Sequence, residues 1–295
     1  MDRDERLFIE GIKSRARKLI RHKIWDGIDE GRVTAWLQQF EARNCELLGA
    51  CLLDSFIFRN RAQVEALLRV ALTSPDVVSP QAICDEATLV ELARRGPDPG
   101  IRLAPVIRLD QPPTKSGCYV LRRLAKSLRI HDKWMVWPQK LRDAPNSLHT
   151  IILVDDFCGS GSQFSEFVEL TDFKEVMASR PDCRVLYITV AAHASGIANV
   201  IKEFPRVKFI PGEILGPEHS FFTGSVLDRI KIDGIANRLK NDYDKIANEV
   251  GLGGRIGYYG FDSQGLTYAF EHGTPNNSLP IYWYQNDSWT SLVNR

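Results

Sequence analysis

Two adjacent carboxylates, Asp155 and Asp156, lie between an apolar run and a loop of small residues. The apolar run covers residues 151–154, and residues 159–162 read Gly-Ser-Gly-Ser before an amphipathic segment begins. This order is typical of a buried parallel strand, a tight loop and the first turn of a helix. Such a loop offers backbone N–H groups and the positive end of a helix dipole to a phosphate. The carboxylates offer acceptors to sugar hydroxyls or to a magnesium ion.

These residues resemble the loop with which type I phosphoribosyltransferases bind phosphoribosyl pyrophosphate (PRPP). In that family, apolar residues precede two acidic residues, which are followed by two more apolar positions and by small Thr, Ser and Gly residues. The resemblance implies that Asp155 and Asp156 hold the ribose as catalytic residues and are ligands of Mg²⁺. It also implies that the 5-phosphate of the substrate contacts Gly159, Ser160, Gly161, Ser162 and Gln163.

Two positions of the loop depart from the pattern of that family. Gly159 stands where many members carry Thr and where purine-salvage members carry an Asp that acts as a base. Ser162 stands where Thr is usual. We expect phosphate binding to tolerate both changes, but the loop supplies no general base. A non-catalytic sensor of PRPP or a nucleotide is therefore an alternative to an enzyme.

A second resemblance covers almost the same residues. Residues 155–162 differ at two positions from Asp-Pro-Phe-Cys-Gly-Ser-Gly-Thr, the cofactor loop of many DNA amino-methyltransferases. Such an enzyme needs an acidic residue after its next strand, to hold the ribose of S-adenosylmethionine. Here that strand runs into His193-Ala194-Ser195, and the pair Pro112-Pro113 lacks the flanking residues of the catalytic motif. The sequence therefore favours the phosphoribosyltransferase, with an S-adenosylmethionine-dependent nucleic-acid methyltransferase and a plain helix-capping turn as alternatives.

Lys115, Ser116 and Gly117 are a candidate second anion-binding loop. They follow a proline-rich stretch and precede a predicted helix. Residues 100–149 around them hold ten basic and three acidic residues. A substrate with several phosphates needs such an excess of positive charge. The basic residues of the predicted helix are explained equally well by a solvent-exposed helix face.

The composition is that of an ordinary soluble protein, with 44% hydrophobic and 25% charged residues. The formal net charge of +1 gives no global field for nucleic acid or for an acidic membrane. The six cysteines form no Cys-x-x-Cys pair, which argues against a disulfide framework and against a zinc site. No apolar run approaches the ~18 residues that span a bilayer, and the charged N-terminus is unlike a signal peptide. We expect a cytoplasmic protein.

Apolar spacing predicts an all-α N-terminal region followed by an α/β region. Residues 5–74 read as helices, with a further short helix at 86–94. The Gly-Pro-Asp-Pro-Gly run at 96–100 favours a boundary between a helical region, residues 1–96, and an α/β domain, residues 97–295. Strands are predicted at 101–109, 133–137, 150–154, 185–192, 207–210 and 266–270, and helices at 118–128, 164–170, 195–203 and 235–250. The alternation indicates an α/β fold with a mainly parallel sheet, which the resemblance implies to be of the type I phosphoribosyltransferase kind.

Asn276 and Asn277 follow the last predicted strand, where polar side chains either line a site or bond their own backbone in a turn. With the acidic loop, Lys115 and the N-terminal helices, this segment resembles a bacterial group of phosphoribosyltransferase-like proteins. That group occurs beside reverse transcriptases (retrons) and other anti-phage modules. The resemblance covers most of residues 32–295 and implies that the protein is the toxic effector of a defence system. We expect both asparagines, together with Lys115, Ser116 and Gly117, to bind substrate.

A phosphoribosyltransferase core needs only the α/β part of the chain, so the N-terminal helices have another purpose. Trp25, Trp36, Phe56 and Phe58 are more aromatic residues than one small bundle must bury. We therefore expect residues 1–75 to dock a partner or a second copy of the chain. In a retron, that partner would be the reverse transcriptase and its RNA–DNA product.

Overall fold

The chain folds into two compact units in the computed structural model, which describes residues 3–73, 92–108, 110–112, 115–223 and 234–295. Residues 63–215 form one unit, which we call the inserted unit. Residues 1–62 and 216–295 together form the other, which we call the discontinuous unit. The chain therefore leaves the discontinuous unit once and returns to it.

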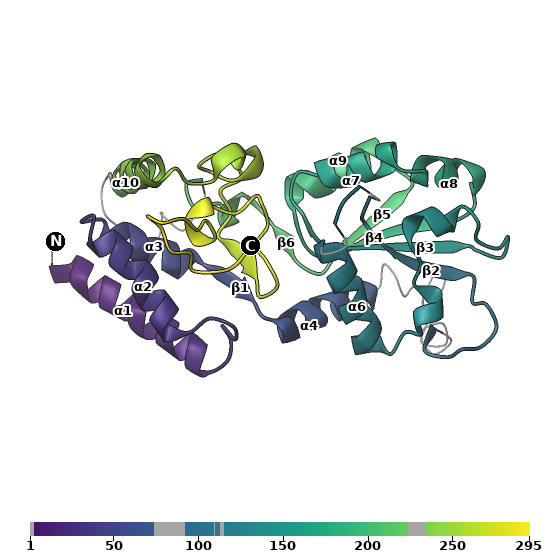
Figure 1. The fold of residues 1–295 in the computed structure, drawn as a ribbon, viewed down its shortest axis with the longest axis horizontal. Coiled ribbons are helices and arrows are strands. Elements are labelled where there is room, and N and C mark those ends of the chain that lie inside the picture. Colours follow the sequence, from purple (N-terminus) through teal and green to yellow (C-terminus); the bar gives the residue numbers. More distant parts are fainter. Residues whose placement is uncertain (1–2, 74–91, 109, 113–114, 224–233) are drawn as a thin grey trace. The chain divides into compact units, whose positions relative to one another are not determined.

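A parallel sheet lies at the centre of the inserted unit (Figure 1). Its strand order is β2-β3-β4-β5, and the short strand β6 pairs with β4. The central strand β3 is buried along almost its whole length, as expected from its run of Ile, Leu and Val. The strands are β2 (Ile101–Pro105), β3 (Thr150–Cys158), β4 (Arg184–His193), β5 (Val207–Pro211) and β6 (Ile214–Leu215).

Helices connect these parallel strands and cover the sheet. Phe164 of α7, Phe173 of α8 and Val200 of α9 join one hydrophobic core with side chains of β3 and β4, whereas α6 lies on the other side of the sheet in Figure 1. The helices are α4 (Arg61–Leu72), α6 (Ser116–Leu128), α7 (Ser162–Leu170), α8 (Phe173–Ser179) and α9 (Ala194–Glu203), with 3₁₀ turns η1 (Asp132–Trp134) and η2 (Pro138–Leu141). Nowhere in the described ranges is a helix both long and apolar enough to cross a bilayer.

The discontinuous unit combines the N-terminal helices with the C-terminal segment. One hydrophobic core holds residues of both, among them Trp36, Phe40, Tyr243, Tyr282 and Trp289. A two-stranded parallel sheet joins the two segments as well, because β1 pairs with β7. The elements are α1 (Arg3–Arg21), α2 (Glu30–Glu41), α3 (Glu46–Ser55), β1 (Ile57–Arg59), α10 (Ile235–Val250) and β7 (Tyr268–Phe270), with 3₁₀ turns η3 (Pro217–His219), η5 (Gly254–Ile256), η6 (Phe261–Ser263) and η7 (Pro280–Tyr282).

The two units do not coincide with the predicted domains. Residues 216–295 share a core with the N-terminal helices, so a single boundary at residue 96 does not separate the units. The same core explains the surplus of aromatic residues that suggested a docking surface. Trp25, Trp36, Phe56 and Phe58 are all buried in it, and their number is therefore no argument for a docked partner.

The predicted alternation of strands and helices is confirmed, with local differences. Residues 57–59, expected to be helical, form strand β1. Residues 133–137 were expected to form a strand. Instead, residues 133 and 134 belong to the 3₁₀ turn η1, and within this segment only Met135 forms a β-bridge, to Leu103 of β2. His131 caps this turn, because its Nδ1 accepts a hydrogen bond from the backbone N–H of Lys133 over 3.1 Å, and Trp134 within the turn is fully buried. The helix predicted at 86–94 lies mostly outside the described residues.

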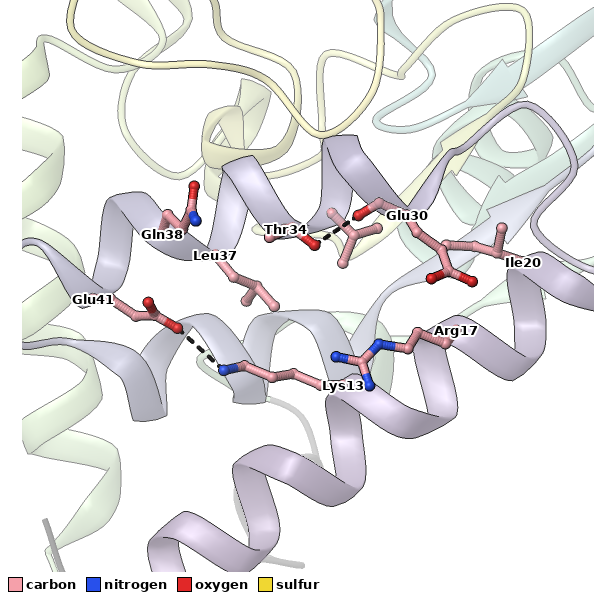
Figure 2. A pocket seen from close by; sticks show the side chains of 9 residues that line it. Lys13, Arg17, Ile20, Glu30, Thr34, Leu37, Gln38 and Glu41 are labelled. Carbon is pink, nitrogen blue, oxygen red and sulfur yellow. Dashed lines mark hydrogen bonds and ion pairs between the residues drawn. The ribbon is translucent and has the colours of Figure 1, made fainter.

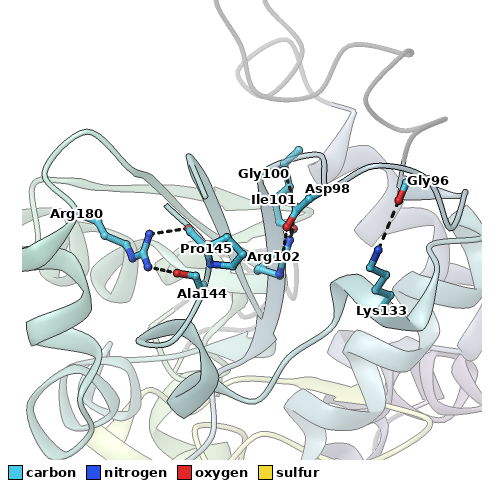
Figure 3. A network of polar contacts seen from close by, with 9 residues as sticks. All are labelled: Gly96, Asp98, Gly100, Ile101, Arg102, Lys133, Ala144, Pro145 and Arg180. Carbon is cyan, nitrogen blue, oxygen red and sulfur yellow. Dashed lines mark hydrogen bonds and ion pairs between the residues drawn. The ribbon is translucent and has the colours of Figure 1, made fainter. Parts of the chain in front are cut away.

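Polar contacts hold the amino end of the sheet (Figure 3). The guanidinium of Arg102 in β2 donates to both carboxylate oxygens of Asp98, over 2.8 and 2.6 Å. Arg180, which precedes β4, donates to the carbonyl oxygens of Ala144 and Pro145, which precede β3. The first contact fixes the segment that leads into β2, and the second joins the segments that lead into β3 and β4, at the end of the sheet opposite the acidic pair.

Candidate functional site

Strand β3 carries the acidic pair to the carboxyl edge of the sheet. It continues through residues 155–158, four residues beyond the predicted end at Val154. The chain then turns at Gly161, whose φ of 90° is in the left-handed region that favours glycine. Helix α7 begins at Ser162. The predicted order of strand, loop and helix is therefore confirmed, and Gln163 in the first turn of α7 contacts the acidic pair.

Asp155 is completely buried, with 0% of its surface exposed. Its Oδ1 accepts a hydrogen bond from the backbone N–H of Asp156 over 3.0 Å. Its Oδ2 accepts one from Gln163 Nε2 over 2.9 Å and a longer one from the Tyr187 hydroxyl over 3.5 Å. Burial raises the pKa of the Asp155 carboxyl well above its usual value, and the adjacent charge of Asp156 raises it further. Asp155 is therefore enclosed by the protein and does not face solvent.

Asp156 has a different environment, because its side chain is half-buried. Its Oδ1 accepts hydrogen bonds from the Ser116 hydroxyl over 2.8 Å and from the backbone N–H of Phe157 over 2.9 Å. Ser116 is the first residue of α6. The structure thus brings the predicted second anion-binding loop next to the acidic pair.

The other two residues of that second loop also lie near the pair. A Cβ atom on Gly117 would lie 3.4 Å from Asp155 Oδ1, so the backbone of α6 passes close to the buried carboxylate. The positive charge of Lys115 acts on the Asp155 carboxyl and partly opposes the rise of its pKa. The segment Lys115-Ser116-Gly117 and the acidic pair therefore form one site.

Helix α9, which follows strand β4, contacts the small-residue loop. Asn199 Nδ2 donates to the carbonyl oxygen of Ser160 over 2.9 Å. A Cβ atom on Gly196 would lie 2.4 Å from the carbonyl oxygen of Gly159, so only glycine fits there. Within the loop, the hydroxyls of Ser160 and Ser162 lie 2.7 Å apart. The loop is therefore held by α9 as well as by β3.

Sequence reasoning missed the residues that support the site from neighbouring elements. Tyr187 contacts Asp155, and Gly196 and Asn199 contact the loop. Tyr187 lies two residues before Thr189, the partner of Asp155, so its position follows from the register of β3 and β4. No local pattern in the sequence specifies that register, and none identifies Gly196 or Asn199.

Asn276 and Asn277 belong to the discontinuous unit and form contacts within it. Asn276 Oδ1 accepts a hydrogen bond from Arg295 Nη2 over 2.5 Å. Asn277 Nδ2 donates to the carbonyl oxygen of Phe261 over 3.3 Å. These bonds join loops of that unit that are distant in sequence, whereas the turn interpretation expected the asparagines to bond their own backbone.

The described residues contain no group of three or more His, Cys, Asp and Glu side chains that could hold a metal ion by themselves. The acidic pair still fits one kind of magnesium site. Mg²⁺ is usually held by one or two carboxylates together with phosphate oxygens of a substrate and water. Asp156 fits that role better than Asp155, since both oxygens of Asp155 already accept hydrogen bonds and are buried.

A groove between α1 and α2 lies in the discontinuous unit (Figure 2). Ion-pairing and apolar side chains line it, and Figure 2 shows Lys13 bonded to Glu41 and Thr34 bonded to the backbone of Glu30. None of the predicted site residues lines this groove. The basic and acidic side chains that line the groove neutralise one another. A ligand with several phosphates needs an excess of positive charge instead.

Residues 33–295 match the family described as PRTase-CE. Because this match covers most of the chain, the protein belongs to that family and is phosphoribosyltransferase-like. No protein with a curated description matches the chain.

Two solved structures match the chain over part of its length. The orotate phosphoribosyltransferase from Aeropyrum pernix is 14% identical, and the match covers 58% of this chain and 75% of that one with a TM-score of 0.32. The AQ2163 protein from Aquifex aeolicus is 12% identical, and the match covers 63% of this chain and 83% of that one, also with a TM-score of 0.32. The predicted α/β fold with a mainly parallel sheet is confirmed by the strand pairing itself.

Proposed function

We propose that this protein binds PRPP, or a closely related ribose phosphate, and transfers its phosphoribosyl group to an acceptor. One observation carries the proposal. The Ser116 hydroxyl lies 2.8 Å from Asp156 Oδ1, so the acidic pair, the loop at 159–163 and the segment at Lys115 meet at one edge of the sheet. Acceptors for sugar hydroxyls, N–H donors for a phosphate and a cation for a second phosphate group stand side by side there.

Each group has a part in the proposed reaction. The N–H groups of residues 160–163 donate to the 5-phosphate, and the Asp156 carboxylate accepts from the ribose hydroxyls. In the transfer, the bond between C1 and the pyrophosphate oxygen breaks, and the electron pair leaves with pyrophosphate. The acceptor forms the new bond to C1 and loses its proton to solvent. The Asp156 carboxylate stabilises the positive charge on the ribose, and Lys115 stabilises the leaving group.

Mg²⁺ is the metal ion that the proposal requires. When bound, it neutralises charge on the pyrophosphate and so makes it a better leaving group. Asp156 would hold the ion together with oxygens of the substrate.

Calorimetry with PRPP and Mg²⁺, followed by an assay of pyrophosphate release, tests the proposal. We expect Asp156→Asn to weaken PRPP binding about tenfold to a hundredfold, because a charge-assisted hydrogen bond contributes about 1.5–3 kcal/mol. Asp143→Asn is the matched control, since Asp143 is an exposed carboxylate of the same unit. Binding of S-adenosylmethionine in place of PRPP would overturn the proposal, and PRPP binding without pyrophosphate release would identify a sensor.

The biological role that we propose is that of a toxic effector in an anti-phage system such as a retron, as the resemblance of residues 32–295 implies. Phosphoribosyl transfer to a base, a nucleotide, a nucleic acid or water would consume a metabolite that every cell needs. Expression in bacteria tests this role. The wild type should arrest growth, whereas the Asp156→Asn variant at equal abundance should not.

A further inference from the structure

We propose that the two carboxylates have different roles: Asp156 contacts the ribose, whereas Asp155 is a positioning residue that fixes the phosphate loop and does not touch the substrate. This inference rests on the proposed function and assigns separate tasks to the two members of the pair.

Asp155 is inaccessible to a ligand in this structure. None of its surface is exposed, and it lies in β3 beneath the first turn of α7. Its carboxylate accepts from three elements of the fold: the backbone of β3 at Asp156, the side chain of Gln163 in α7, and the hydroxyl of Tyr187 in β4. A ribose hydroxyl could reach Asp155 only by displacing one of these donors.

Asp156 is placed to meet the substrate. Its side chain is half-buried rather than enclosed. The Ser116 hydroxyl and the N–H of Phe157 both donate to Oδ1. These two bonds fix the orientation of the Asp156 carboxylate. A sugar hydroxyl can therefore donate to a carboxylate that is both partly exposed and already oriented.

The contact between Asp155 and Gln163 explains what a buried carboxylate does at this position. Gln163 is the second residue of α7, within the turn whose N–H groups are aimed at the 5-phosphate. Asp155 therefore ties that turn to the sheet. Loss of the hydrogen bond between Asp155 and Gln163 should make the phosphate loop more mobile, whereas loss of the Asp156 carboxylate should remove a contact to the sugar.

Discrimination between two sugars separates the two roles. Ribose 5-phosphate carries a 2-hydroxyl that 2-deoxyribose 5-phosphate lacks, and both carry the same phosphate. We expect the wild type to bind ribose 5-phosphate more tightly, and Asp156→Asn to reduce that preference about tenfold. Asp155→Ala should weaken binding of both sugars by a similar factor of about tenfold, so that the preference is kept.

Two further variants distinguish the positioning role of Asp155 from unfolding of the Asp155→Ala protein. Gln163→Ala removes the same hydrogen bond from the side of an exposed residue, and it should weaken both sugars equally. Asp155→Asn keeps an oxygen that can accept from the N–H of Asp156, and its amide N–H can donate to Gln163 Oε1 once the Gln163 amide reverses. It should therefore recover most of the affinity that Asp155→Ala loses. If Asp155→Ala reduced the preference for ribose as much as Asp156→Asn does, Asp155 would contact the sugar and the inference would be wrong.

Hydrogen exchange on the unliganded protein distinguishes failure of this inference from failure of the proposed function. Asp155→Ala and Gln163→Ala should speed exchange of the amides of residues 160–164, and Asp156→Asn should not. If the wild type bound neither sugar phosphate but this exchange pattern held, the proposed function would fail while the positioning role of Asp155 stood. Unchanged exchange in Asp155→Ala would refute the positioning role.

Discussion

Gly161 shows at the level of one residue why the loop at residues 159–162 requires glycine. Its φ of 90° lies in a region where a side chain is strained, and a Cβ atom there would lie 3.2 Å from Val200 Cγ2. We expect Gly161→Ala to lower the free energy of unfolding by about 1–2 kcal/mol, the usual cost of left-handed backbone for other residues. Denaturant unfolding measures this loss.

Gly96→Ala is the control for that measurement. A Cβ atom on Gly96 would have no heavy atom within 4 Å, and the φ of this residue is outside the left-handed region. Gly96 lies in the same unit as Gly161. The free energy of unfolding of this variant should stay within about 0.5 kcal/mol of the wild type. Equal stabilities of the two variants would mean that the loop tolerates a side chain.

The sequence predicted which residues form the acidic loop, but it did not predict how the two carboxylates differ. The apolar run and the small residues are local signals, so the strand, the loop and the helix could be placed. The burial of Asp155 depends on Gln163 and Tyr187. Tyr187 is distant in sequence and reaches the site only through the pairing of β3 with β4, which no local pattern specifies.

At the scale of single elements, the ion pair of Asp98 with Arg102 fixes the beginning of β2. The Arg102 guanidinium, on a residue that is 8% exposed, donates to both Asp98 oxygens and lowers the pKa of that carboxyl to about 2. Asp98→Asn leaves this charge without its partner. We expect a loss of about 1–3 kcal/mol in the free energy of unfolding at neutral pH.

The difference between wild type and Asp98→Asn should depend on pH in a defined direction. Because folding lowers the pKa of Asp98, its contribution is complete above the unfolded value of about 3.9. It is lost as pH falls from about 4 towards 2. Urea unfolding at neutral pH and at a series of pH values in that window measures the difference. A difference that stayed constant down to about pH 2 would contradict the assignment.

Most elements of the inserted unit could be predicted because their signals are short-range. The buried strands read as apolar runs, and α6 and α9 follow helical spacing with few differences at their ends. The failures involve short segments whose conformation depends on distant partners. Residues 57–59 form a strand only because β7 lies beside them, about two hundred positions along the chain.

At the scale of the whole molecule, the sequence could not show that the first and last segments share a core. Hydrophobic patterns show that Trp36 and Phe40 are buried, but not that Tyr282 and Trp289 cover them. The contact is specific in geometry: the rings of Trp36 and Tyr282 stack at 5.8 Å, and Phe40 meets Trp289 edge-on at 5.3 Å. The division at residues 62 and 215 follows from this long-range packing.

That division predicts that the inserted unit folds by itself. The core formed by β3, β4 and α7–α9 contains only residues of this unit. We expect a fragment of residues 61–215, which keeps all of α4, to unfold in one cooperative transition, measured by circular dichroism during urea denaturation. A fragment without a cooperative transition would mean that the two cores depend on each other.

The same fragment tests whether the discontinuous unit contributes to the site. Ser116, Asp156 and the loop at 159–163 all lie within the fragment, so it should bind ribose 5-phosphate with an affinity close to that of the full chain. Asn276 and Asn277 are absent from it. If the fragment folds but binds at least tenfold more weakly, the discontinuous unit supplies part of the site. Asn276→Ala and Asn277→Ala in the full chain would then show whether the asparagines are that part, because their loss should reproduce the weaker binding without unfolding the protein.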